Sequence, residues 1–141
     1  MNIKPIIVVA GEPNSIFFEI FFKSLKNKFQ SPIVLISSYK LLKLQMKSLK
    51  YKKKIKVLKL ENLLKYKLNN KTINIINVEY KFTKSFEKKS KKYNKYIKRT
   101  FQIAFKIINN NISDKFINGP ISKKKFLNKK YLGVTEYLAS Q

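Results

Sequence analysis

A chain of 141 residues is long enough for one domain with a hydrophobic core, and a 44% hydrophobic fraction with 11 Phe and 8 Tyr excludes a disordered chain. It contains no Cys and no His, which excludes disulfides, thiolate metal sites and an imidazole base or ligand from its own residues. No stretch approaches the roughly 20 apolar residues of a membrane span, and the N-terminal apolar run is too short for a signal peptide. We therefore expect a cytoplasmic protein without a membrane partner.

The charge is unusual in kind as well as in size. The formal net charge is +25, yet only one of the 32 basic residues, Arg99, is an arginine. Proteins that bind phosphate use arginine freely, because its planar guanidinium makes bidentate hydrogen bonds. Lys, Asn, Ile, Phe and Tyr share AT-rich codons and are abundant together here, so mutational bias explains the charge at least as well as a nucleic-acid partner does. We predict a solvated lysine surface and no sequence-specific nucleic-acid partner.

Apolar runs alternate with helical periods along the chain. Runs of β-branched residues indicate strands buried on both faces, and spacings of three and four residues indicate helices. Strands are predicted at 5–10, 32–37, 55–60, 73–78 and 116–117, and helices at 17–28, 39–49, 61–68 and 97–108. This alternation predicts a single α/β unit over residues 1–141, with a layered, mostly parallel sheet flanked by helices.

Two segments carry more detailed expectations. The helix predicted from Phe17 has two N-cap candidates, Asn14 and Ser15. It places Ile20 with Phe17 on one apolar face, while Phe18 and Phe22 add a second one. Such a helix is expected between layers or against a partner subunit. Residues 79–93 are lysine-rich and aperiodic, which predicts an exposed loop.

Basic and aromatic residues interleave in residues 91–99, as they do in proteins that bind single-stranded nucleic acid. Packing of Tyr96 and Phe101 on the core is the simpler interpretation of the same pattern. Both interpretations remain open at the level of sequence.

Two turns follow predicted strands and are candidates for ligand loops. Gly11-Glu12-Pro13 follows the first strand, and Gly119-Pro120 follows the last. In open α/β sheets, ligands bind at the carboxyl ends of the strands. Neither turn is a dinucleotide fingerprint or a P-loop, and a purely structural turn is the simpler interpretation of each alone. A further helix is predicted to open at Thr135 and Glu136; it has no C-cap, so we expect an element that is incomplete at Gln141.

Taken together, the two turns resemble 4-hydroxythreonine-4-phosphate dehydrogenase, the NAD-dependent enzyme of pyridoxal phosphate (pyridoxine) biosynthesis. In that family the first block typically reads Gly-(Asp/Glu)-Pro-Ala-Gly-Ile-Gly-Pro-Glu-Ile, and the second reads Gly-Pro-Ile-Asn-Lys, a spacer and Gly-His-Thr-Glu-Tyr-Leu-Ala. The matching residues of the first block are Gly11, Glu12, Pro13, Ile16, Glu19 and Ile20. Those of the second are Gly119, Pro120, Ile121, Lys123, Gly133, Thr135, Glu136, Tyr137, Leu138 and Ala139.

The resemblance implies a fold like that of isocitrate and isopropylmalate dehydrogenases, here truncated to the N-terminal part of the family. It implies a cytoplasmic homodimeric oxidoreductase that oxidises 4-phosphooxy-threonine, a small phosphorylated amino acid, with NAD or NADP. The resulting β-keto acid decarboxylates. A divalent metal (zinc, magnesium or cobalt) would polarise the alcohol oxygen.

The resemblance also implies where the site residues lie. The family's His-Thr pair contacts substrate; here Thr135 remains and Val134 replaces the histidine. Gly119 and Lys123 are loop candidates. The three metal-ligating histidines and most of the nicotinamide site of the family lie further along than residue 141, so we expect this fragment alone to be inactive. The alternative is a non-catalytic remnant or a lysine-rich nucleic-acid-binding protein.

Overall fold

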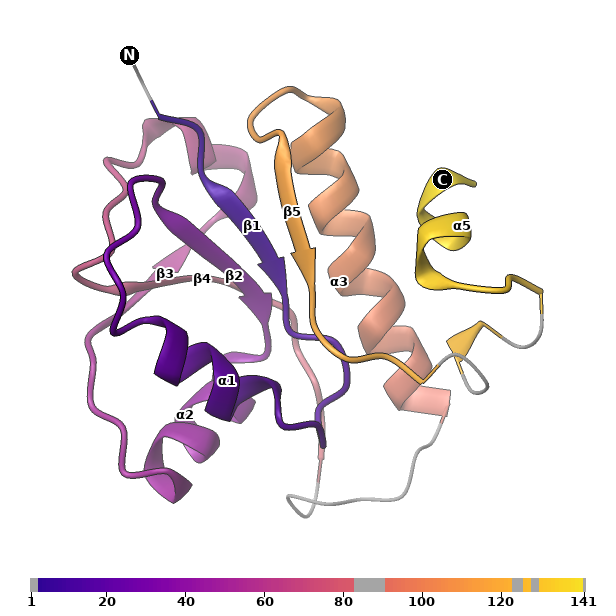
Figure 1. Cartoon of the computed structure of the whole chain (residues 1–141), viewed down its shortest axis with the longest axis horizontal. Helices are drawn as coiled ribbons and strands as arrows, with labels where there is room; N and C mark the ends of the chain where they lie inside the picture. The colour runs from indigo at the N-terminus through magenta and orange to yellow at the C-terminus, as the bar shows by residue number, and fades with distance from the viewer. Residues whose placement is uncertain (1–2, 83–90, 123–125, 128–129, 141) are drawn as a thin grey trace.

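The computed structural model describes residues 3–82, 91–122, 126–127 and 130–140. Within these ranges, five parallel strands form one sheet in the order β3-β4-β2-β1-β5 (Figure 1). The strands are β1 (Ile6–Val9), β2 (Ile33–Ser37), β3 (Ile55–Leu58), β4 (Ile73–Asn77) and β5 (Lys115–Asn118). The predicted α/β class and parallel sheet are confirmed, and all five predicted strands are present.

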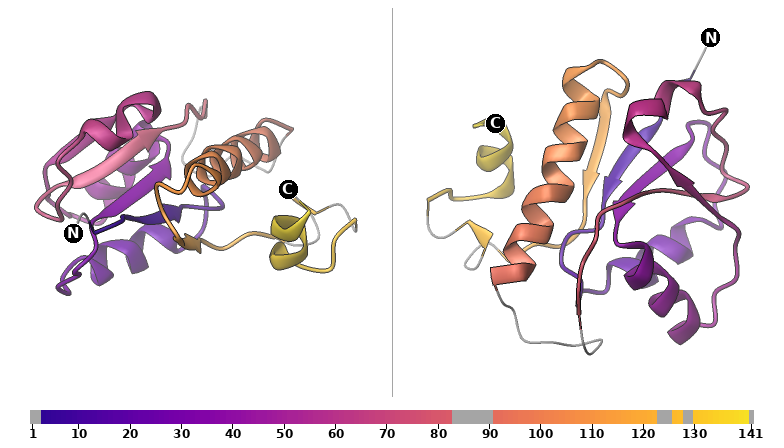
Figure 2. Two further views of the ribbon diagram at one scale, coloured as in Figure 1. Left: turned by 90° about the horizontal axis from the view of Figure 1, so that it is seen from above. Right: turned by 180° about the vertical axis from the view of Figure 1, so that it is seen from behind.

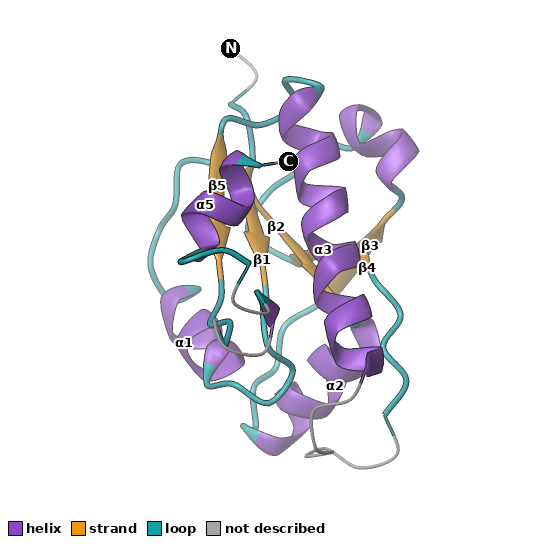
Figure 3. Cartoon of the chain, turned by 90° about the vertical axis from the view of Figure 1, so that its right-hand side faces the viewer, coloured by secondary structure: helices purple, strands orange, loops and turns teal. Residues whose placement is uncertain are grey.

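Helices cover both faces of the sheet. Helices α1 (Phe17–Ser24) and α2 (Tyr39–Ser48) lie on one face, and α3 (Lys91–Asn109) crosses the other (Figure 2). A 3₁₀ helix, η1 (Leu60–Lys65), follows β3, where the sequence predicted a short helix over 61–68. The last helix, α5 (Val134–Ala139), lies on the same side as α3 (Figure 3).

Alternate residues of the central strands point into two separate hydrophobic cores. Ile7 and Val9 of β1 point into the α3 side, whereas Val8 points toward α1 and α2. Val34 and Leu35 of β2 divide in the same way. Because successive side chains of a strand point to opposite faces, a strand covered on both faces must be apolar throughout. This is why the runs that predicted the strands are continuous rather than alternating.

Helix α1 has one wide buried face rather than two. Phe17, Phe18, Phe21 and Phe22 are all buried, whereas Ile20 is 53% exposed. At 100° per residue, these four phenylalanines span an arc of about 140°, which a single sheet can cover. The predicted second apolar face and the core position of Ile20 are therefore wrong. The helix also ends at Ser24 rather than near Lys28, and its N-cap position is Ile16.

The predicted exposed loop over 79–93 is also wrong at both of its ends, while residues 83–90 lie outside the described part. Tyr80 is buried, and α3 begins at Lys91 and buries Tyr93. Tyr80 packs on Tyr96 with ring centroids 4.8 Å apart. The aromatic rings therefore extend the core to the start of α3, and Tyr96 and Phe101 are core residues as the simpler interpretation predicted.

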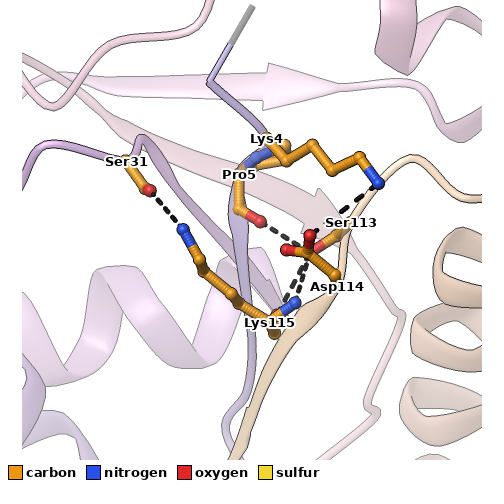
Figure 4. A network of polar contacts seen from close by, with 6 residues as sticks. All are labelled: Lys4, Pro5, Ser31, Ser113, Asp114 and Lys115. Atoms are coloured by element: carbon orange, nitrogen blue, oxygen red, sulfur yellow. Dashed lines mark hydrogen bonds and ion pairs between the residues drawn. The ribbon is translucent and has the colours of Figure 1, made fainter.

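A polar network closes the amino edge of the sheet (Figure 4). The buried Ser113 hydroxyl donates to the carbonyl oxygen of Pro5 at 2.6 Å and accepts from the backbone N–H of Lys115 at 3.1 Å. The Lys115 ammonium reaches the Ser31 hydroxyl at 3.1 Å. These bonds satisfy polar groups where β1 and β5 begin and fix their register.

No described helix is both long enough and apolar enough to cross a bilayer.

The buried Tyr96 hydroxyl ties α3 to the carboxyl end of β2. It is bonded to the Ser37 hydroxyl at 3.0 Å and accepts from the backbone N–H of Ser38 at 3.1 Å. Burial raises the pKa of Tyr96 to about 12, although the bonds to Ser37 and Ser38 act in the opposite direction. The folded protein thus holds this proton more tightly than the unfolded chain, whose tyrosines titrate near 10.

We therefore predict that Tyr96 sets part of an alkaline limit to stability. Its contribution to the free energy of unfolding is up to about 3 kcal/mol. This contribution is fully present below about pH 10 and is lost as the pH rises through 12. Urea unfolding between pH 8 and 12 measures the decline. Tyr96→Phe should be less stable at pH 8 by about 1–2 kcal/mol, because the Ser38 N–H loses its partner, yet should decline less steeply with pH.

Tyr39→Phe, which removes a half-buried tyrosine hydroxyl of α2, is the matched control with which the pH dependence of Tyr96→Phe is compared. An equally steep decline in Tyr96→Phe would show that other groups set the limit.

Candidate functional site

The loops that follow β1 and β5 meet at the carboxyl edge of the sheet. The backbone N–H of Gly119 donates to the carbonyl oxygen of Val9 at 2.7 Å, and that of Glu12 donates to Pro120 at 2.9 Å. Two turns separated by more than 100 residues in the sequence therefore form one unit. The prediction that Gly11 and Gly119 lie at strand carboxyl ends on the same edge is confirmed.

Both positions require glycine, for related reasons. A Cβ at Gly119 would lie 2.2 Å from the carbonyl oxygen of Ala10, and one at Gly11 would lie 2.5 Å from that of Pro120. Gly11 also has a φ of +73°, which side chains rarely tolerate. Since the clashing atoms belong to the backbone, no rotamer change relieves them. The two loops can approach this closely only because neither glycine has a side chain.

The side chain of Glu12 connects the two loops. Its Oε1 accepts from the backbone N–H of Ser122 at 2.7 Å. Burial, followed by the nearby Glu12 carboxylate, raises the pKa of the Tyr93 hydroxyl. Glu12 therefore links the loop after β1 to the loop after β5, and its carboxylate lies near the first turn of α3.

This edge is also where the strand order turns back. From β1 the chain continues to α1 on one face of the sheet, whereas from β5 it continues to the side of α3 and α5 (Figure 3). Open α/β sheets bind ligands in the crevice that such a reversal creates. Here backbone contacts join the two loops at this edge, from Glu12 to Pro120 and from Gly11 to Pro120 and Gly119.

The structure separates the predicted site residues into two groups. Gly119 belongs to the joined loops, whereas Val134 and Thr135 form the first turn of α5. Thr135 is exposed, and Val134 is half-buried against the core on the α3 side. The Tyr137 ring anchors α5 on Phe101 in an edge-to-face contact with centroids 5.8 Å apart. Lys123 lies outside the described residues.

The described carboxylates do not form a metal site. Glu12 accepts from Ser122, Glu136 accepts from the backbone N–H of Leu132 at 2.7 Å, and Glu19 pairs with Lys23 at 2.7 Å. Asp114 lies at the opposite edge beside Lys4. Within residues 3–82, 91–122, 126–127 and 130–140, no three acidic side chains gather in a group that could hold an ion. These residues do not fit the divalent metal that the resemblance implies.

Sequence reasoning missed the position of Tyr93 near Glu12. The signal was present, because Tyr93, Tyr96, Ile97 and Phe101 follow helical spacing and continue the face that predicted α3. The lysines between these residues obscured the period. Starting the helix one turn earlier would have brought the Tyr93 ring to the carboxyl edge.

The fold and this edge define a class: an open, parallel α/β sheet with two joined loops at the carboxyl ends of its strands. Comparison with protein-family profiles and with curated protein sequences gives no match. Solved structures, in contrast, match along nearly the whole chain.

Three of the matching structures are described as 4-hydroxythreonine-4-phosphate dehydrogenases, one of them provisionally. The enzyme from Burkholderia phymatum aligns with a TM-score of 0.82 and 20% identity, over 98% of this chain and 43% of its own. The enzyme from Klebsiella pneumoniae aligns with a TM-score of 0.78 and 20% identity, over 97% of this chain and 44% of its own. A Salmonella typhimurium protein assigned provisionally to the same enzyme aligns with a TM-score of 0.80 and 22% identity, over 97% of this chain and 44% of its own. The chain therefore shares the fold of these dehydrogenases and spans less than half of their length.

We predict that the loop contact depends on the absence of a Cβ at both glycines. Gly11→Ala and Gly119→Ala should each lower the free energy of unfolding by at least about 2 kcal/mol, because backbone atoms must move. Gly133→Ala is the matched control: a Cβ there meets nothing within 4 Å, and the backbone is extended. Its effect should be under about 1 kcal/mol, because the lower entropy of the unfolded chain is opposed by the weak preference of Ala for the N-cap position. Equal effects at all three positions in urea titrations would contradict the close approach.

Proposed function

We propose that this chain forms the substrate-binding part of an NAD- or NADP-dependent dehydrogenase acting on 4-phosphooxy-threonine. The observation that carries the proposal is the meeting of the two motif blocks. The blocks are far apart in the sequence, yet their glycines touch at the edge where α/β sheets bind ligands. The shared fold with 4-hydroxythreonine-4-phosphate dehydrogenases supports the same assignment.

The proposed reaction removes a hydride from the secondary alcohol of the substrate and transfers it to the nicotinamide. The β-keto acid that results then loses carbon dioxide. Nicotinamide supplies the hydride chemistry, and the protein orients the reactants. We assign to Thr135 a hydrogen bond to the substrate, since its side chain is exposed on the first turn of α5. Metal and nicotinamide binding are assigned to residues other than those described here.

A homodimer is part of this proposal, with one restriction from the structure. Phe17 and Phe18 are buried against their own sheet. They are therefore not available to a partner subunit, and any dimer contact must use other residues.

Substrate binding tests the proposal directly. Isothermal titration of the chain with 4-phosphooxy-L-threonine should give a measurable affinity, and Thr135→Val should weaken it about tenfold by removing one hydrogen bond to a charged ligand. Val134→His restores the residue type of the family motif and should tighten binding at least about fivefold.

Leu132→His is the matched control, because Leu132 is 85% exposed and precedes α5. An equal gain from Leu132→His would indicate general attraction of phosphate to an added imidazole. Circular dichroism checks that each variant is folded. Absence of binding by the folded wild-type chain would contradict the proposal.

We also predict that the 141-residue chain alone gives no turnover. It has neither His nor Cys, and its described carboxylates are dispersed, so no ligand set for a catalytic divalent ion is present. The assay is NADH or NADPH formation from 4-phosphooxy-L-threonine with zinc, magnesium or cobalt supplied. Metal-dependent turnover would show that the catalytic groups lie within these residues.

A further inference from the structure

A basic groove lies on α2 and the segment that follows it, away from the joined loops. Its volume is about 1350 Å³. Side chains of α2, of residues 50–54 and of Phe82 line it. Seven of the lining residues are lysines: Lys40, Lys43, Lys47, Lys50, Lys52, Lys53 and Lys54.

The lysines of α2 lie on one side of the helix by their spacing. Intervals of three and four residues separate Lys40, Lys43 and Lys47, and such intervals keep side chains on one helix face. The opposite face, with Leu41 and Leu42, is buried in the core. The three lysines thus form a row about 10 Å long, at 1.5 Å per residue.

A tight turn brings the remaining lysines back beside this row. Lys50 has a φ of +51°, in the left-handed region that few non-glycine residues adopt. The backbone N–H of Tyr51 donates to the carbonyl oxygen of Met46 at 2.9 Å, which closes the end of the helix. This turn fixes the direction in which residues 52–54 leave α2.

The described lining of the groove carries only positive charge. None of the described residues that line it is acidic. The described ion pair nearest in sequence, between Glu19 and Lys23, lies on α1. Cations placed together repel one another, and an anionic ligand relieves the repulsion. A ligand with one charge cannot neutralise this row of lysines and those of residues 50–54, whereas a polyanion with regularly spaced charges can.

The floor of the groove is apolar but recessed. Tyr51 is half-buried and stacks on Phe22 with ring centroids 4.4 Å apart. Leu44 and Phe82 are also half-buried, and Met46 is buried. A membrane-binding surface needs apolar side chains that project into the lipid, and those of the groove do not. Recessed aromatic rings below a basic rim suit the bases and phosphates of a single strand.

We propose that this groove binds single-stranded nucleic acid without sequence preference, with the lysine row on the phosphates and the aromatic floor near the bases. Lysines contact phosphates as point charges and read no base, so this proposal is compatible with the absence of a sequence-specific partner.

The test is the salt dependence of binding to a fluorescein-labelled 12-mer of dT, followed by anisotropy between 50 and 200 mM NaCl. For single strands, the logarithm of the association constant falls with the logarithm of salt by about 0.7 per phosphate contact. Lys43→Gln/Lys47→Gln should therefore reduce the slope by about 1.4 and weaken binding roughly tenfold at 50 mM.

Lys98→Gln/Lys106→Gln is the matched control, since both residues are exposed lysines of a helix and neither lines the groove. It removes the same charge and should change the affinity less than twofold. Circular dichroism confirms that both variants are folded. A mixed-sequence 12-mer should bind as tightly as dT.

Three results would overturn the proposal. Equal losses in the two double variants would show that the charge acts diffusely over the surface. More than tenfold discrimination among 12-mers of different sequence would indicate base readout. Tighter binding to phosphatidylserine vesicles than to dT at equal phosphate concentration would assign the groove to a membrane surface.

Discussion

The backbone contact between the loops after β1 and β5 is the constraint on which the arrangement of this protein depends. It requires glycine at positions 11 and 119, because a Cβ at either would meet backbone atoms at 2.5 Å or less. It also places Glu12 where its carboxylate can reach the loop after β5 and the start of α3. With these loops joined, the chain leaves β1 toward one face of the sheet and β5 toward the other. The contact therefore lies where the two layers diverge, which is also the edge of the candidate site.

Much of the fold could be predicted from local sequence, because strands buried on both faces must be apolar throughout. The runs at β1, β2 and β4 show this directly, and their alternation with helices indicates a parallel sheet. The order of the strands was not predicted, since it depends on contacts between distant residues. The wrong prediction for α1 has a similar origin. Sequence periodicity identified the apolar residues but could not show that one sheet covers all four phenylalanines while Ile20 faces outward.

The candidate site was only partly predictable. Two short motifs indicated that Gly11 and Gly119 act together, and the sheet brings them into contact. Motif spacing placed Thr135 at the start of a helix but gave no distance from the loops, because that distance depends on how Tyr137 anchors α5 to α3. Composition likewise indicated a diffuse lysine surface, and it did not indicate that α2 and the turn at Lys50 gather seven lysines along one groove. Charge count is a property of composition, whereas charge placement is a property of the fold.

Native-state hydrogen exchange tests the central claim most directly. The amide of Gly119 donates to Val9 and that of Glu12 donates to Pro120, so each reports on the contact between the loops. If the contact is part of the cooperative core, both amides should exchange only through global unfolding, with the same opening free energy as the β1 amides and the same dependence on urea. Exchange of these two amides through a local opening, insensitive to urea and faster than that of β1, would show that the loops are separate and that the site is not organised by their contact.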